Sequence, residues 1–208
     1  MRVLITGFEP FGKYKVNPSW EVAKTLNGLE IAGAEIVAEK LPVAFKKVIH
    51  LIPELLRNHD PSIIISLGLA SGRPVITVER VAINVMDTEK PDNEGYKPED
   101  EPIFQDGPAA YFATIPIKRI VKRLREEGIP AMISNSAGTY LCNTVMYTFL
   151  YYIDKMGMNA RAGFIHLPFL PKQVVDKPQP SMAFEMMVKG VRIAIEESIN
   201  AFKESAGR

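Results

Sequence analysis

The stretch RVLITGFEPFGKYKVNPSWEVAKTLNGLEIAGAEIVAEKL, residues 2–41, decides the fold class. It begins and ends with short runs rich in β-branched and other strand-forming residues, Arg2 to Thr6 and Ala34 to Leu41. Between them, Pro18 to Leu26 has helical periodicity, and Asn17 stands before it as a helix cap. A strand, a helix and a strand in this order predict the α/β class, in which helices cover a mostly parallel sheet.

The same alternation continues along the chain. Further strands are expected at Ile63 to Leu67, Val75 to Val85, Ala131 to Ser134 and Ala162 to Leu167. Further helices are expected at Ala44 to Asn58, Ile117 to Glu127, Leu141 to Met156 and Ser181 to Lys203. Pro53 should kink or split the first of these helices. We expect one catalytic domain over residues 1–208, because the length suits a single core.

Two of the expected helices are apolar in different ways. Leu141 to Met156 is apolar on most sides, which favours either burial or an oligomer interface. The last helix carries one apolar stripe, typical of a helix that packs on a core: Phe184, Met187, Val188, Val191, Ile195, Ile199 and Phe202. The Met186-Met187 pair in this helix is interpreted as core.

Composition excludes several classes of protein. The 25 basic and 24 acidic residues give a net charge of +1, so no overall field recruits nucleic acid or an anionic membrane. The single cysteine, Cys142, excludes an intrachain disulfide framework and a multi-thiolate zinc site. The N-terminus lacks a signal-peptide pattern, and the apolar runs are shorter than the roughly 20 residues that span a bilayer. We therefore expect a cytoplasmic protein.

A long acidic loop is expected at about residues 87–110. Eight acidic residues, two lysines and three prolines lie between Asp87 and Asp106. We interpret the loop first as a solvated excursion, with a functional lid or an interaction surface as alternatives. The basic face of the helix that follows it is interpreted as solvated surface.

Candidate catalytic groups come from the scarce ionisable residues. His50 and His59 are interpreted as structural or solvated. His166 ends a buried strand, where open α/β sheets gather their sites, although a hydrogen-bonded core histidine is the alternative. Cys142 stands in the first turn of a helix, whose positive end should lower the pKa of a thiol; a small apolar core residue is the alternative.

Glu79 is a third candidate, because it shares strand parity with Val75, Val81 and other apolar residues. A carboxylate on an apolar face needs a cationic or N–H partner. An imidazole could be this partner of Glu79, and pairing with Arg80 is the structural alternative. A bulge in the strand would reverse the parity and place Glu79 on the other face. Cys142, His166 and Glu79 together suggest a thiolate nucleophile, an imidazole base and acid, and a carboxylate that fixes the imidazole tautomer.

The motifs are similar to those of pyroglutamyl peptidase type I, also called pyrrolidone carboxyl peptidase. They run in order as Gly7-Phe8-Glu9-Pro10-Phe11-Gly12, Asn17-Pro18-Ser19, Glu79-Arg80-Val81-Ala82-Ile83-Asn84, Pro91-Asp92-Asn93-Glu94-Gly95, Ser134-Asn135-Ser136-Ala137-Gly138, Leu141-Cys142-Asn143 and Gly163-Phe164-Ile165-His166-Leu167-Pro168. The resemblance covers about residues 7–182 and includes the spacing of all three candidate catalytic groups.

This resemblance implies a cytosolic cysteine exopeptidase that hydrolyses an N-terminal pyroglutamyl (5-oxoprolyl) residue from peptides through a thioester intermediate. It implies an α/β/α sandwich like that of nucleoside phosphorylases, a homotetramer, and no metal or organic cofactor. Carried over by motif, Cys142 is the nucleophile, His166 the general base and acid, and Glu79 the residue that orients His166. Phe8, Phe11 and Asn17 are the expected substrate-binding residues.

The chain departs from the family pattern in the expected acidic loop, where Glu89 replaces an arginine and Lys90 an aliphatic residue. Lys13 also replaces a glycine. Two other functions stay open at this point. A phosphorylase-like enzyme would use Ser71-Gly72-Arg73 as an anion site, and a catalytically inactive member of the family would act as a binding protein.

Overall fold

The structure, a computed structural model, describes residues 1–206, so residues 207–208 of the expected domain lie outside the described residues. The strands are β1 (Arg2–Phe8), β2 (Glu30–Ile31), β3 (Ala34–Leu41), β4 (Ile63–Leu69), β5 (Ile76–Glu79), β6 (Val81–Ile83), β7 (Ala110–Phe112), β8 (Ala131–Ser134) and β9 (Arg161–Leu167). The helices are α1 (Pro18–Leu26), α2 (Phe45–His59), α3 (Ile117–Glu126), α4 (Leu141–Lys155), a 3-10 turn η1 (Pro171–Gln173) and α5 (Phe184–Ala206).

A seven-stranded sheet in the order β2-β3-β1-β4-β9-β5-β8 forms the centre of the molecule. Strands β3, β1, β4 and β9 are parallel, β5 runs antiparallel to β9 but parallel to β8, and β2 is antiparallel to β3. The expected mostly parallel α/β sheet is confirmed. Strands β6 and β7 form a separate antiparallel pair.

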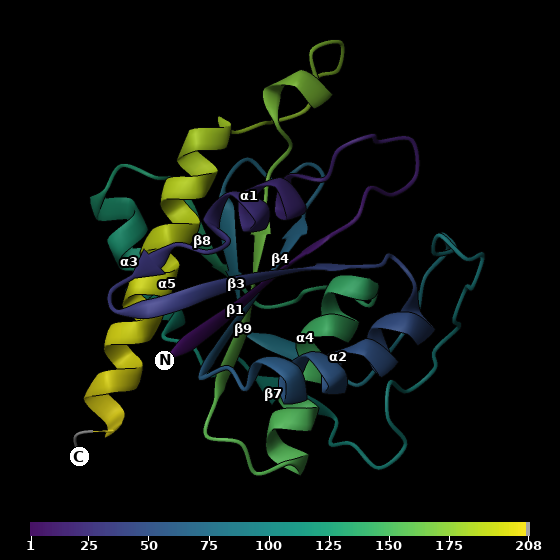
Figure 1. Cartoon of the computed structure of the whole chain (residues 1–208). Coiled ribbons are helices and arrows are strands. Elements are labelled where there is room, and N and C mark those ends of the chain that lie inside the picture. The colour runs from purple at the N-terminus through teal and green to yellow at the C-terminus, as the bar shows by residue number, and fades with distance from the viewer. Residues whose placement is uncertain (207–208) are drawn as a thin grey trace.

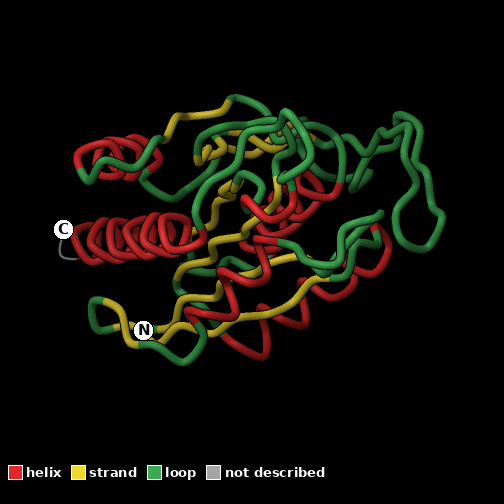
Figure 2. Tube along the Cα trace, turned by 90° about the horizontal axis from the view of Figure 1, so that it is seen from above, coloured by secondary structure: helices red, strands yellow, loops and turns green. Residues whose placement is uncertain are grey.

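Helices cover both faces of the sheet (Figure 1). Residues of α1, α3 and α5 share one buried apolar cluster with alternate sheet residues such as Val3, Ile5 and Ile165. Residues of α2 and α4 share a second cluster with Leu4, Ile64 and other residues that point the opposite way. Seen from above in Figure 2, the strands run between helices. The layered arrangement is the α/β/α sandwich that the resemblance implied.

The expected helices are present, with two differences in detail. Pro53 lies inside α2, which runs unbroken from Phe45 to His59. In α5 the apolar stripe is buried or packs against the core, but Met186 is 38% exposed, so only Met187 of the methionine pair is core. Helix α4 is buried along most of its length, including Tyr147 and Phe149.

The single strand expected from Val75 to Val85 is wrong. The chain leaves the main sheet after Glu79, and Arg80 separates β5 from β6. The Arg80 N–H donates to Ser134 O, while its carbonyl accepts from Ala113 N, so Arg80 bonds to both sheets. Because the residues on both sides of Arg80 have the same alternating pattern, the sequence carries no turn signal there.

The loop between β6 and β7 is held to the rest of the molecule, so the interpretation as a solvated excursion is wrong in part. Asp92 is buried, and its Oδ2 accepts the Phe45 N–H at the start of α2 at 2.9 Å. Its Oδ1 accepts the N–H groups of Glu94 and Tyr96. The Asn93 N–H donates to Val43 O. One carboxylate thus caps a helix and orders the turn around it.

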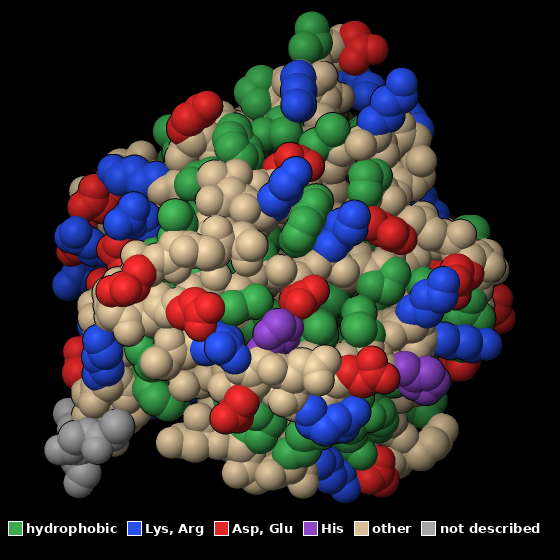
Figure 3. Space-filling model, in the orientation of Figure 1, with side chains coloured by type: hydrophobic (Ala, Val, Ile, Leu, Met, Phe, Trp, Pro, Cys, Tyr) green, Lys and Arg blue, Asp and Glu red, His purple; other side chains and the backbone are tan. Residues whose placement is uncertain are grey.

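Charges of both signs are interspersed over the face in Figure 3, in keeping with the balanced composition. On α3, Arg119 pairs with Glu197 and Glu204 of α5. The basic face of α3 is therefore partly paired. Within residues 1–206, no helix combines the length and apolar character that crossing a membrane requires.

Candidate active site

Glu79 and His166 form a buried pair on adjacent strands. In the antiparallel register of β5 and β9, Thr77 lies opposite His166, so the side chains of Thr77, Glu79 and His166 share one face of the sheet. Glu79 Oε1 lies 2.7 Å from His166 Nδ1. A proton on Nδ1 donates to this carboxylate, which leaves Nε2 as the proton acceptor. The imidazole partner expected for Glu79 is confirmed.

Arg73 completes this cluster, and Arg80 does not. Arg73 Nη1 donates to Glu79 Oε1 at 2.8 Å and to Thr77 Oγ1 at 2.7 Å. Arg80 instead donates to Asn135 Oδ1. The sequence interpretation assigned Arg73 only to a possible anion site. Its guanidinium is engaged by Glu79, so a phosphorylase-like anion site at Ser71-Gly72-Arg73 loses its cation.

Cys142 lies in the first turn of α4, on the sheet face that carries His166. Gly68 of β4 lies opposite His166 in the parallel register, and a Cβ at Gly68 would come within 2.9 Å of Cys142 Sγ. The thiol and the imidazole are therefore arranged around the same glycine. A side chain at this position would displace either the thiol or the Phe164 ring, 2.8 Å away.

Helix α4 is fixed next to Cys142 by Asn143. The buried amide of Asn143 accepts the Ile83 N–H and donates to the carbonyls of Ile83 and Val85. These bonds attach the start of α4 to the strand that follows Glu79. The segments that carry Cys142 and Glu79 are thus positioned relative to each other by one side chain.

Burial controls the protonation of the site. Burial raises the pKa of the Cys142 thiol to about 12, the Glu79 charge adds to this rise, and Arg73 opposes it. Burial also lowers the pKa of His166, although Glu79 acts in the opposite direction. Burial alone would raise the pKa of Glu79, but its bonds to His166 and Arg73 outweigh that, so the pKa is lowered. The backbone at the start of α4 lowers the pKa of the thiol, as expected, but burial outweighs it, so the net shift is upward and the resting pair is a thiol beside a neutral imidazole.

A small cavity opens at Cys142. Its lining is largely apolar and includes all three expected substrate-binding residues: Phe8, Phe11, Asn17, Val43, Leu69, Tyr140, Leu141 and Cys142. Asn17 also caps α1, since its Oδ1 accepts the Ser19 N–H at 3.2 Å, and its Nδ2 donates to Glu9 O. Tyr140 and Leu69 line this cavity too, and only their closeness to Cys142 and Gly68 in the sequence could have indicated them.

The other two histidines lie outside this cluster, as expected. His59 Nε2 lies 2.8 Å from Glu39 Oε1, a partly exposed pair. His50 is exposed on α2. Both fit the structural or solvated interpretation.

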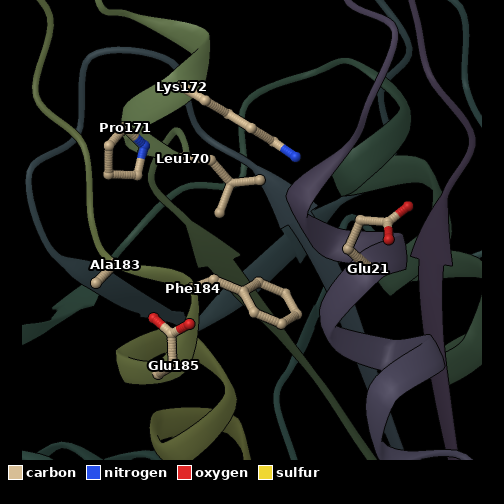
Figure 4. Close-up of a pocket in the computed structure, with 7 residues that line it drawn as sticks. All are labelled: Glu21, Leu170, Pro171, Lys172, Ala183, Phe184 and Glu185. Carbon is tan, nitrogen blue, oxygen red and sulfur yellow. The ribbon is translucent and has the colours of Figure 1, made fainter.

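A second hollow lies between the starts of α1 and α5 (Figure 4). Leu170, Phe184 and Glu21 are among the residues that line it. In Figure 4 the Phe184 ring points toward α1. None of the three expected catalytic residues lines this hollow, whereas Cys142 lines the small cavity described above.

Comparison with known proteins assigns the chain to a family. The sequence model of the pyroglutamyl peptidase family matches residues 1–201. A pyrrolidone-carboxylate peptidase of Thermococcus onnurineus is 59% identical over 97% of this chain and 100% of its own, and one of Bacillus licheniformis is 52% identical over 93% and 90%. The solved pyrrolidone carboxyl peptidase of Thermococcus litoralis superposes with a TM-score of 0.96 at 44% identity, covering 98% of this chain and 96% of that one. The chain belongs to the pyroglutamyl peptidase family.

Proposed function

We propose that Cys142, His166 and Glu79 are the catalytic residues with which this enzyme removes an N-terminal pyroglutamyl residue from a peptide. The observation that carries these roles is the cluster on one sheet face. A buried carboxylate holds Nδ1 of an imidazole at 2.7 Å, and the thiol in the first turn of α4 approaches the same sheet face at Gly68, which lies opposite His166. This is the arrangement of a nucleophile, a base and an orienting acid.

The mechanism starts from the neutral thiol and imidazole. As Cys142 Sγ attacks the pyroglutamyl carbonyl carbon, the thiol proton passes to His166 Nε2. The tetrahedral intermediate collapses when His166 gives this proton to the departing amine nitrogen and the C–N bond breaks. A thioester remains on Cys142. Water then gives a proton to His166 and attacks the thioester. The C–S bond breaks, pyroglutamate leaves, and His166 returns the proton to Cys142 Sγ, which restores the thiol.

Two features stabilise the charges that develop. Glu79 offsets the positive charge on His166 in both steps, because it is held ionised by Arg73 and buried beside the ring. The oxyanion is placed at the N-terminus of α4, where the backbone N–H of Cys142 has no partner within the helix.

The cavity suits a neutral lactam. Phe8, Phe11 and Leu69 supply apolar surface on which the five-membered ring packs. A peptide with a free N-terminal ammonium would bury an unpaired charge in the same space, which is strongly unfavourable. Selection of pyroglutamyl peptides follows from this desolvation cost.

The remaining expectations concern the setting of the enzyme. We propose that the chain forms one catalytic domain, acts in the cytoplasm and assembles as a homotetramer. The family membership supports these statements. Sedimentation velocity tests the assembly, with a single species of four chains expected and a stable monomer counting against it.

The test of the function is release of a fluorophore from a pyroglutamyl amide, with alanyl and prolyl amides as controls. We expect turnover of the pyroglutamyl amide only, lost in Cys142→Ser. Glu79→Gln and His166→Ala test the other two roles. A well-folded, reduced wild-type enzyme without turnover would contradict the proposal and favour the inactive binding protein.

A further inference from the structure

A wider groove continues from the cavity at Cys142. Phe11 and Tyr140 line both spaces, so the two are contiguous. The groove is built from three loops, which supply Phe11, Gly12, Lys13 and Tyr14, then Thr88, Lys90, Pro91 and Asn93, and then Phe169, Lys177 and Gln179, together with Ser71 and Tyr140. Two of these loops follow β1 and β9. Both strands are neighbours of β4 in the sheet. The groove therefore lies at the edge of the sheet where the substrate cavity opens.

The groove is basic. Lys13, Lys90 and Lys177 each come from a different loop, and no Asp or Glu is among the residues that line it. Within residues 1–206, the lysines that form ion pairs with carboxylates are others: Lys47, Lys97, Lys122, Lys155 and Lys189.

The contacts of the groove lysines leave their charges available. Lys177 Nζ donates to the Gln173 carbonyl at 3.2 Å and lies 5.4 Å from the centre of the Tyr14 ring. Neither contact neutralises the ammonium. Asp176 lines an adjoining hollow together with Lys13 and Lys177, and it reduces the positive field on that side only. Lys90 lies on the opposite loop, and its neighbour Glu89 is exposed and does not line the groove.

The proposed function dictates what enters this groove. With the pyroglutamyl ring in the cavity and its carbonyl carbon at Cys142, the peptide leaves the cavity at the scissile bond. An extended chain advances about 3.3 Å per residue, so the first residues after the bond pass along the groove. Their side chains are then within reach of lysine side chains on both sides.

We propose that this groove binds the peptide segment that follows the pyroglutamyl residue and selects acidic side chains at its first two positions. The inference rests on the proposed function. Its chemistry is charge complementarity between the carboxylate of the peptide and the three ammonium groups. An exposed ion pair changes binding by a factor of up to about five. For three lysines at a partly exposed site we expect an acidic peptide to be preferred about five- to tenfold in kcat/KM.

The experiment compares peptides that differ only in charge. Pyroglutamyl-Glu-Ala-amide and pyroglutamyl-Gln-Ala-amide have nearly the same shape, and the amide removes the C-terminal carboxylate as a second anion. We expect kcat/KM to be about five- to tenfold higher for the Glu peptide at low salt, and the ratio to fall toward one as salt screens the charges. A pyroglutamyl-Lys-Ala-amide should be the poorest of the three.

Variants assign the preference to the groove. Lys13→Gln, Lys90→Gln and Lys177→Gln should each reduce the Glu-to-Gln ratio, and the triple variant should bring it close to one. Lys15→Gln removes the same charge from the same loop as Lys13 but lies outside the groove lining, so it should keep the wild-type ratio. Because each ratio is measured within one variant, a change in overall activity does not affect it.

Two results would overturn the inference. One is a Glu-to-Gln ratio of kcat/KM of one or less for the wild type at low salt. The other is an undiminished Glu-to-Gln ratio in the three single variants and the triple variant. Turnover of a neutral pyroglutamyl fluorogenic amide separates this failure from failure of the proposed function. An enzyme that cleaves the neutral amide without preferring the acidic peptide refutes the groove alone. An enzyme that does not cleave the neutral amide refutes the function itself.

Discussion

At the scale of single residues, the central feature is the Glu79 carboxylate, which contacts both His166 and Arg73. Glu79 Oε1 lies 2.7 Å from His166 Nδ1 and 2.8 Å from Arg73 Nη1. A fully buried carboxylate needs such partners to remain ionised. The cluster therefore contains a cation besides the three residues that the motifs indicated, and this cation helps to set the protonation of the other members.

The protonation of Cys142 and His166 predicts the pH dependence of the reaction. Because burial lowers the pKa of His166 from its ordinary value of 6.5, kcat/KM should be flat near neutrality and fall only as the pH drops below 6.5, where the base becomes protonated. Because the pKa of the thiol is about 12, the free enzyme should show no thiolate absorbance at neutral pH relative to Cys142→Ser. A clear thiolate band there would show that a thiolate–imidazolium pair forms before substrate binds.

Removal of Arg73 should move this pH profile. Arg73 lowers the pKa of both Glu79 and His166, so Arg73→Gln should shift the acid limb of kcat/KM to higher pH and reduce kcat more than it changes KM. The lost charged hydrogen bond should also cost about 1.5–3 kcal/mol of unfolding free energy. Arg80→Gln is the matched control, since Arg80 contacts Asn135 rather than Glu79. An acid limb that stays in place in Arg73→Gln would contradict this role.

At the scale of elements, the site depends on the close approach of α4 to β4. Gly68 permits it, because a Cβ there would lie 2.9 Å from Cys142 Sγ and 2.8 Å from the Phe164 ring. Such distances are shorter than ordinary carbon contacts, so the neighbours would have to move. The partly buried thiol is one of these neighbours.

Gly68→Ala should therefore reduce kcat at least tenfold while the protein remains folded, since small displacements of a reacting group have large effects on rate. Ser66→Ala is the control on the same strand and face. Within the described residues the buried Ser66 hydroxyl has no hydrogen-bond partner, so its removal should leave activity close to that of wild type. Steady-state kinetics with circular dichroism tests both variants. Equal activity of Gly68→Ala and wild type would show that the contact is not restrictive.

Most elements could be predicted from the sequence, and the exceptions have physical causes. The bounds of α1, β3 and β8 agree with the expectation, because a cap, a turn or a change of period marks each end. The strand expected from Val75 to Val85 failed at Arg80, where pairing with two different sheets bends the chain without a local signal. Asp92 was misjudged because an acidic residue in a loop looks the same in sequence whether it is solvated or caps a distant helix.

The candidate site shows the same limit. Motif spacing indicated Glu79, Cys142 and His166, and the structure brings them to one sheet face. Arg73 was missed because its partner lies six residues away on a strand, and no periodicity links them. The net pKa of the thiol is raised, against the expectation, because burial outweighs the start of the helix, and burial cannot be read from the sequence.

At the scale of the whole molecule, the buried pair links stability to pH. Glu79 has a lowered pKa, so its contribution to stability is present above its ordinary value of 4.5 and is lost as the pH falls through the lower folded value. His166 is buried neutral with a lowered pKa, so its contribution declines as the pH falls below 6.5. Because of both groups, the free energy of unfolding decreases as the pH falls into the acid range.

We therefore expect the Tm of the wild type to fall steadily as the pH is lowered below 6.5, and His166→Gln to show a shallower fall over the upper part of this range. Calorimetry at closely spaced pH values tests this. His50→Gln is the control, because His50 is exposed and should leave the slope unchanged. The same slope in His166→Gln and wild type would show that His166 is not buried as the neutral imidazole.

The thioester mechanism is tested most directly by the mass of the enzyme quenched in acid during turnover of a pyroglutamyl peptide. We expect a population heavier by one pyroglutamyl group, located on the peptide that contains Cys142 and absent from Cys142→Ser. Turnover that proceeds in Cys142→Ser, or an acyl group attached to another residue, would contradict the thioester mechanism at Cys142.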